Sequence, residues 1–331
     1  MTTTIGRSPY IGTLIDTTDH DTVLGVMGKA GLNYHVSKVD VYSEPIITPD
    51  GVTTVRFGSD AGIVGWLEDG VPTPYRTVGA RYEILQNREA FEPFQYLWDE
   101  GFITSIEQAG RTHNGQKAYM LARLSQECRL ADRHDPYVLA TTTHDGSGAF
   151  TVRGILRRFS CANQLPSIFS TRRDSVVRVR HYGRSERDIA GEVKQALLTS
   201  ILPAFQQYEE VMLQPRMQDE LDEAEIARFV HNLFPYRPDI IEHIMERGDL
   251  YYDELERGQK RSVTMTTTKR TAVTSLMFGE GNGDLAGTRA GLFQAAVEWS
   301  DYHSGGNRAV RILNGEDVAW KRRALNIALS I

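Results

Sequence analysis

Two strong turn signals lie close together in the first half of the chain, and each is flanked by residues that favour strands. Asn114-Gly115 separates residues 102–111 from 117–124, and Asp145-Gly146-Ser147-Gly148 separates residues 137–144 from 149–160. Asn-Gly and Asp-Gly pairs suit the tight turns of β-hairpins. Parallel strands need a crossover of about a dozen or more residues, which these short connections do not contain. The sequence therefore predicts an antiparallel sheet built from hairpins.

The other segments predict further strands before residue 184 and helices after it. Strands are expected at residues 34–42, 52–57 and 176–181, with an extended segment at 75–86 and a helix at 88–100 capped by Asn87. Further helices are expected at 185–213 (bent or broken at Pro203), 219–233, 238–247, 263–278, 285–302 and 316–329. We predict an α+β fold in which a β-rich region, residues 1–184, and a helical region, residues 185–331, form one continuous unit.

The composition argues against several classes of protein. Hydrophobic residues make up 40% and charged residues 24% of the 331 residues, which is ordinary for a globular protein. No apolar run approaches the ~20 residues that cross a bilayer, and the first residues lack the order of a secretion signal. Cys128 and Cys161 form neither a disulfide framework nor a metal motif. We expect a cytoplasmic protein, in the host-cell cytoplasm if a phage encodes it.

The strongest chemical signal is a run of arginines in a chain whose net charge is -6. Between Arg153 and Arg187 there is no lysine, and the only acids are Asp174 and Glu186. Guanidinium forks suit a phosphate backbone because each can bind two oxygens. The arginines predicted to contact nucleic acid are Arg153, Arg157, Arg158, Arg172, Arg173, Arg178, Arg180 and Arg184.

Strand periodicity gives these arginines an arrangement. Arg153 and Arg157 fall on one face of a strand, as do Arg178 and Arg180, because side chains alternate with a period of two. Aromatic residues lie between them, as expected where bases stack on a platform. A second interpretation remains open: the acid-rich stretch Glu209–Glu225 could pair with the arginines, within the chain or between subunits.

Motifs that suggest an enzyme are weak. The glycine-rich run 279–287 lacks the Gly-Lys-Ser/Thr ending of a phosphate-binding loop, so we interpret it as a loop with Asp284 as a helix cap. His144-Asp145 is interpreted as turn chemistry at a hairpin tip. An acidic patch could hold Mg²⁺ in a nuclease, but no lysine-bearing strand motif accompanies it; it comprises Asp249, Asp253, Glu254 and Glu256. We predict no catalytic residue, no metal and no cofactor.

Several segments together resemble a family of phage- and plasmid-borne proteins defined by a domain of unknown function (domain of unknown function 932). The resemblance runs from roughly Leu32 to Leu329. It is carried by Tyr75-Arg76-Thr77-Val78, Tyr82, Gln86-Asn87, Glu107-Gln108-Ala109-Gly110, Asn114-Gly115, Thr143-His144-Asp145-Gly146-Ser147, Arg158-Phe159-Ser160-Cys161-Ala162-Asn163-Gln164-Leu165, Arg180-His181, Gly287-Thr288 and Ala295-Ala296-Val297-Glu298-Trp299-Ser300-Asp301-Tyr302.

Families of this kind are distantly similar to phage annealing proteins and the Rad-fifty-two-type superfamily. That similarity implies a curved antiparallel sheet crossed by a helix, assembly into rings or filaments, and binding of single strands along a basic groove without a cofactor. We therefore expect a single-stranded DNA-binding and annealing protein of phage or plasmid recombination that works as a homo-oligomer. The alternatives are a structural or regulatory phage protein that self-assembles, and a metal-dependent nuclease.

Overall fold

The computed structural model describes most of the chain. It covers residues 22–67, 70–79, 81–125, 134–158, 164–166, 176–179, 186–305, 311 and 318–331, and it leaves undescribed the side chains of 57–60, 113, 158, 164–166, 176–179 and 186. Antiparallel sheets occupy the first half and helices dominate the second, so the α+β prediction is confirmed. None of the described helices has both the length and the apolar character needed to cross a bilayer.

The central sheet is an antiparallel meander extended by two short strands. Its strands are β6 (Ile103–Thr112), β7 (Lys117–Leu124), β8 (His134–Thr143), β9 (Phe150–Arg158), β10 (Gln164–Pro166) and β11 (Val176–Val179). The order is β10-β9-β8-β7-β6, and β11 also pairs with β9. Both predicted hairpins are present. Asn114 (φ 53°) and Gly115 (φ 89°) take the left-handed conformations that this dipeptide favours in a turn.

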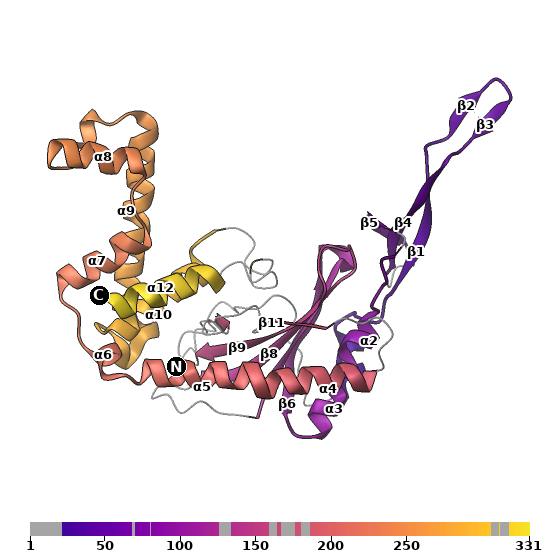
Figure 1. Cartoon of the computed structure of the whole chain (residues 1–331), viewed down its shortest axis with the longest axis horizontal. Coiled ribbons are helices and arrows are strands. Elements are labelled where there is room, and N and C mark those ends of the chain that lie inside the picture. Colours follow the sequence, from indigo (N-terminus) through magenta and orange to yellow (C-terminus); the bar gives the residue numbers. More distant parts are fainter. Residues whose placement is uncertain are drawn as a thin grey trace, which may run out of the picture.

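A second set of strands forms an arm that projects from one end of the molecule (Figure 1). β1 (His35–Tyr42), β4 (Arg56–Trp66) and β5 (Pro72–Val78) make a three-stranded antiparallel sheet. Beyond it, β2 (Ile46–Thr48) and β3 (Gly51–Thr53) pair only with each other and form the tip. The predicted strand 52–57 is divided between β3 and the start of β4. The rest of β4 was not predicted, since that strand is rich in glycine, which weakens a strand signal.

Helices cover one face of the central sheet. A long helical rod crosses that face in three parts: α4 (Glu186–Ala196), a π turn (Leu197–Ile201) and α5 (Leu202–Met212) (Figure 1). Pro203 lies in the first turn of α5, directly after the π turn, so the rod continues past the proline where a bend or break was expected. Three shorter helices pack nearby: α1 (Val23–Lys29) contacts β6, α2 (Asn87–Phe91) contacts β8, and α3 (Phe94–Asp99) contacts both β6 and α4.

One expected helix is divided. The predicted helix 88–100 is two short helices, because Pro93 has no N–H to continue the hydrogen-bond ladder. Its predicted cap was also wrong by one residue. Gln86 is the cap, and its backbone N–H donates to Glu89 at 2.8 Å, whereas the side chain of Asn87 turns inward.

The remaining helices build the other end of the molecule and a second arm (Figure 1). They are α6 (Pro215–Gln218), α7 (Glu223–Leu233), α8 (Pro238–Arg247), α9 (Arg257–Met277), α10 (Arg289–Tyr302) and α12 (Val318–Ser330). α10 is buried almost all round and contacts both α9 and α12. One continuous hydrophobic cluster includes Val138 and Val152 of the sheet as well as Phe293 and Ala324 of these helices. The β arm and the α8–α9 arm rise from opposite ends of the long axis toward the same side (Figure 1).

Candidate nucleic-acid interface

Strand β9 divides its side chains between the two faces of the central sheet. Phe150, Val152 and Leu156 belong to the main core beneath the helical rod. Arg153 and Arg157 alternate with them, so they lie on the opposite face, four residues and therefore two strand periods apart. No register shift interrupts the pairing of β9 with β8 between these positions. We call this side of the central sheet the arginine face.

An apolar strip runs between the two arginines. It consists of side chains from β7, β8 and β9 that form their own cluster and are at most 4% exposed: Tyr119, Leu121, Tyr137, Leu139 and Ile155. Arg153 pairs with Leu139 across the strands, and Arg157 pairs with Asp135, so the arginines flank the strip. Because the tyrosine rings are buried, they offer no open platform for stacked bases in this conformation.

A β-bulge aims a carboxylate at the arginine face. Ile106 pairs with Ala122 but Gln108 pairs with Leu121, which leaves Glu107 as the extra residue of β6. Glu107 Oε2 accepts from Arg157 Nη1 at 3.3 Å, and Glu107 Oε1 accepts from the hydroxyl of Tyr137 at 2.8 Å. Glu107 therefore holds Arg157 in place. No local pattern in the sequence indicates this pair, since the partners are 50 residues apart.

Burial and opposite charges act against each other around this pair. Burial raises the pKa of Glu107, while the hydrogen bond from Tyr137 and the charge of Arg123 lower it. Burial lowers the pKa of Arg157. Arg123 Nη2 lies 2.5 Å from Asp135 Oδ1, and this hydrogen bond raises the pKa of Arg123. Arg123, Arg153 and Arg157 thus share this face with the carboxylates of Glu107 and Asp135.

The other predicted arginines fall largely outside the described residues. Arg158 ends β9, and Arg178 of β11 pairs with Thr151, but neither side chain is described. Four lie outside the described residues altogether: Arg172, Arg173, Arg180 and Arg184.

The acid-rich stretch Glu209–Glu225 has a described partner elsewhere in the chain. Asp219 and Glu225 both bind Arg289 of α10, at 3.3 and 2.9 Å. The structure records no ion pair between this stretch and Arg153 or Arg157 among the residues that it describes.

Comparison with known families gives one result. The family model named Domain of unknown function (DUF932) matches residues 74–324. The chain belongs to this family. No curated protein and no solved structure matches it.

Several residues that carried the resemblance fasten the hairpin tips of this DUF932 domain to the β arm and α2. The hydroxyl of Tyr75 donates to Asn114 O at 3.1 Å, and that of Tyr82 donates to Thr143 O at 3.3 Å. Asn87 donates to Leu32 O at 3.0 Å, and its Oδ1 lies 2.8 Å from His144 Nε2. These residues therefore have a structural role that explains their presence without a ligand.

His144 is part of this junction and not of the exposed hairpin tip where the sequence placed it. Its side chain is fully buried, and burial lowers its pKa to about 4. The turn chemistry expected here belongs to Asp145, whose Oδ1 accepts from Ser147 N at 3.0 Å and from Ser147 Oγ at 2.6 Å.

The glycine-rich run also has a packing role. Asn282 Nδ2 donates to the carbonyls of Leu276, Met277 and Gly291, which ties the run between α9 and α10. The predicted helix cap, Asp284, is wrong: α10 begins after Thr288, whose hydroxyl accepts from Gly291 N at 3.1 Å.

Within the described part of the chain, no group of three or more His, Cys, Asp or Glu residues is placed to hold a metal ion. In the acidic patch, Glu254 pairs with Arg247 at 3.2 Å.

Proposed function

We propose that the chain binds single-stranded DNA and promotes strand annealing in phage or plasmid recombination, without catalysis, as a self-associating protein. The observation that carries the proposal is the arginine face, where Arg153 and Arg157 lie on one side of β9. Phosphate oxygens suit the guanidinium fork. Since Tyr119 and Tyr137 are buried, phosphate contact and not base stacking is the basis of the proposal.

The architecture supports this proposal by analogy. β6–β9 form an antiparallel sheet whose other face is crossed by the rod of α4 and α5 (Figure 1), the arrangement implied by the similarity to annealing proteins. In the proposed mechanism the arginines reduce the repulsion between two backbones, so that complementary strands pair without nucleotide hydrolysis.

A binding titration tests the proposal. Fluorescein-labelled single- and double-stranded oligonucleotides are titrated with protein at several salt concentrations, with anisotropy as the readout. Arg153→Ala/Arg157→Ala should weaken binding to every sequence alike and flatten the log–log salt slope by roughly 1 to 1.5, because each single-strand phosphate contact contributes ~0.7. The matched control, Arg88→Ala/Arg228→Ala, removes the same charge from exposed helix positions and should leave the slope unchanged.

A structural role is the principal rival, and the ion pair between Arg157 and Glu107 favours it. On that view the double variant loses thermal stability or its assembled state first, and the slope of its residual binding equals that of the wild type. A folded, assembled double variant with wild-type affinity and slope would remove these arginines from the interface. Degradation of the oligonucleotide that requires Mg²⁺ would support the nuclease alternative instead.

A further inference from the structure

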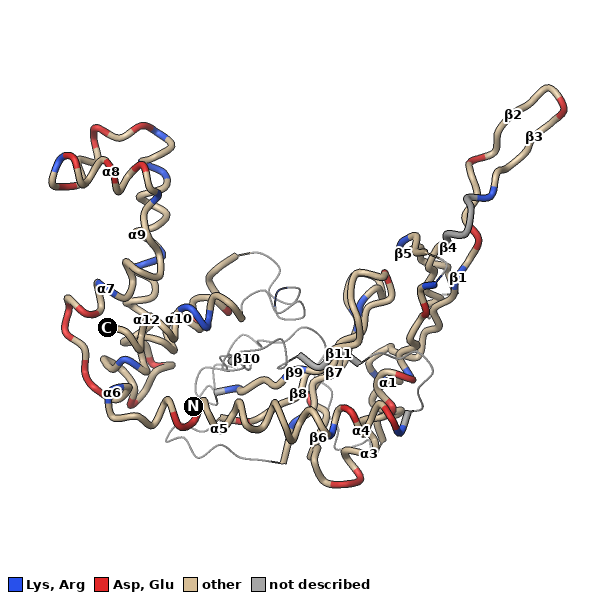
Figure 2. Tube along the Cα trace, in the orientation of Figure 1, with Lys and Arg blue, Asp and Glu red and all other residues tan. Residues whose placement is uncertain are grey.

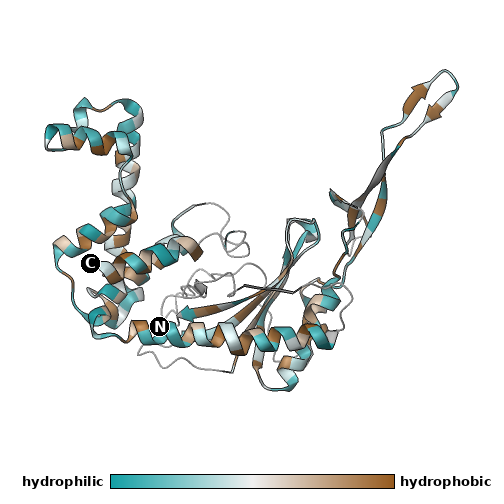
Figure 3. Ribbon diagram, viewed as in Figure 1, coloured by the Kyte–Doolittle hydropathy of each residue, from teal (hydrophilic) through white to brown (hydrophobic). Residues whose placement is uncertain are grey.

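The tip of the β arm exposes apolar side chains that nothing in the described chain covers. Ile47 and Val52 face each other across β2 and β3 and are 86% and 70% exposed. Figure 3 shows both strands of the tip as hydrophobic, far from the body of the molecule. A two-stranded ribbon alone is at best marginally stable in water, and a protruding apolar patch marks a contact surface.

The same tip is acidic. Glu44 and Asp50 flank the two strands and are exposed, and the segment 43–55 contains no lysine or arginine. The tip therefore combines an apolar ribbon with a net charge of -2. A partner that covers it must provide an apolar groove with basic residues at its rim.

The start of α9 carries exposed basic residues beside an apolar groove, next to the acidic residues Asp253, Glu254 and Glu256 of the preceding turn. α9 contains no Asp or Glu, and Arg257 and Arg261 at its start are exposed and take part in no ion pair recorded among the described residues. Positions 257, 261, 264, 268 and 271 recur at helical spacing and are all exposed, so they form one stripe along the helix. Figure 2 marks basic positions along α9 and acidic positions on the β2–β3 tip.

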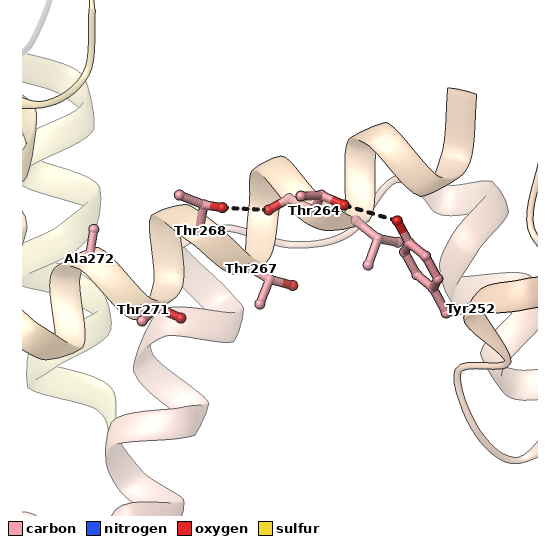
Figure 4. A pocket seen from close by; sticks show the side chains of 7 residues that line it. Tyr252, Thr264, Thr267, Thr268, Thr271 and Ala272 are labelled. Carbon is pink, nitrogen blue, oxygen red and sulfur yellow. Dashed lines mark hydrogen bonds between the residues drawn. The ribbon is translucent and has the colours of Figure 1, made fainter. Parts of the chain in front are cut away.

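Beside this stripe lies a groove of about 630 Å³ between α9 and the turn that precedes it. Its lining includes Tyr252, Val263, Ala272 and the methyl-bearing side chains of Thr264 and Thr268, and its surface is mainly apolar (Figure 4). The hydroxyls of Tyr252, Thr264 and Thr268 make hydrogen bonds within the chain. Tyr252 OH lies 3.1 Å from Thr264 Oγ1, and Thr268 donates to Thr264 O at 2.8 Å. The groove can thus accept apolar side chains without leaving these groups unpaired.

We propose that the β2–β3 tip of one copy docks in the α9 groove of a second copy, with Glu44 and Asp50 against Arg257 and Arg261. The two surfaces lie at opposite ends of the long axis (Figure 1). The contact is therefore heterologous and repeats head to tail, which gives a ring if the rotation closes and a filament if it does not. This inference supplies the contact for the self-association included in the proposed function, and it rests on that part alone.

A charge swap tests the contact. Glu44→Arg/Asp50→Arg gives a tip variant, and Arg257→Glu/Arg261→Glu gives a helix variant. Each alone opposes like charges across every contact and should self-associate at least about tenfold more weakly than the wild type. An equimolar mixture restores opposite charges at both kinds of contact, because the altered tip meets the altered helix and the native tip meets the native helix. Sedimentation velocity should show assemblies in the mixture and 37.2 kDa monomers in each variant alone.

Three results would each overturn the docking proposal. They are wild-type assembly by either variant alone, a mixture that stays monomeric, and a wild type that is monomeric at every concentration. Circular dichroism confirms that the variants are folded.

A charge-neutral variant, Ile47→Ser/Val52→Ser, separates this proposal from the proposed function. It should be monomeric and still bind a short single-stranded oligonucleotide with the wild-type salt slope per protomer. If it assembles like the wild type, the docking proposal fails alone. If wild-type protein binds no oligonucleotide, the proposed function fails while the docking result stands.

Discussion

A buried ion pair between α10 and α12 allows a quantitative test of the helical region. Lys321 Nζ lies 2.6 Å from Asp301 Oδ1, and the two side chains are 0% and 1% exposed. Lys321→Met fills similar volume but removes the ammonium group and leaves a carboxylate in the interior. Breaking a buried pair from one side costs about 3–5 kcal/mol, because the remaining charge is buried away from water and has lost the opposite charge. We expect that loss in the free energy of unfolding.

The chain offers a matched control at the same distance. Lys194 Nζ lies 2.6 Å from Glu100 Oε2, but these side chains are 38% and 50% exposed. Lys194→Met should cost about 1 kcal/mol or less, since water screens the pair. Because the N–O distance is the same in both pairs, the difference between the two losses of unfolding free energy measures the effect of burial.

Urea unfolding followed by tryptophan fluorescence provides the assay. The rings of Trp299 and Trp320, whose centroids are 5.6 Å apart, lie next to the pair in sequence and report on the same helices. Lys321→Met/Asp301→Leu should recover most of the loss, because an apolar pair replaces the ionic one. A Lys321→Met variant no less stable than Lys194→Met, or a double variant as unstable as the single one, would refute the reasoning.

Three further predictions concern the sheet and its junction. His144→Gln should flatten the pH dependence of stability. The native pKa of His144, about 4, lies below the ordinary 6.5, so the unfolded state binds the proton first as pH falls. The wild type should therefore lose about 3 kcal/mol of unfolding free energy between pH 6.5 and pH 4, as measured by urea unfolding at each pH. Gly115→Ala should cost about 1–3 kcal/mol of stability because an alanine is strained at its φ of 89°, and more because the new Cβ would lie 2.5 Å from the hydroxyl of Tyr75. Gly101→Ala is the control: its φ is 77° but its Cβ would meet open space, so thermal unfolding should show only the backbone cost. Glu107→Gln keeps an acceptor for the hydroxyl of Tyr137 but removes a negative charge from the arginine face. Oligonucleotide affinity in the anisotropy titration should therefore rise about two- to fivefold. Unchanged affinity would count against phosphate contact on this face.

The sequence predicted those parts of the fold that depend on neighbouring residues. Asn114-Gly115 specified a hairpin because few other residues adopt two successive positive φ angles, and the structure has both. Helix α8 begins and ends where the sequence placed it, between Pro238 at its first turn and Gly248 in the left-handed conformation after its end. Strand alternation likewise put Arg153 and Arg157 on one face.

Other features depended on residues far apart in the chain, and only the tertiary structure decided them. The partner of Arg157 is Glu107, which a bulge in another strand aims toward it. His144 was predicted to be a turn residue but is buried, and its side chain is hydrogen-bonded to that of Asn87, 57 residues away in the sequence. No local pattern encodes such contacts, because they arise from strand register and from the packing of whole elements. Propensity acts over a few residues, whereas burial and charge pairing are properties of the folded chain.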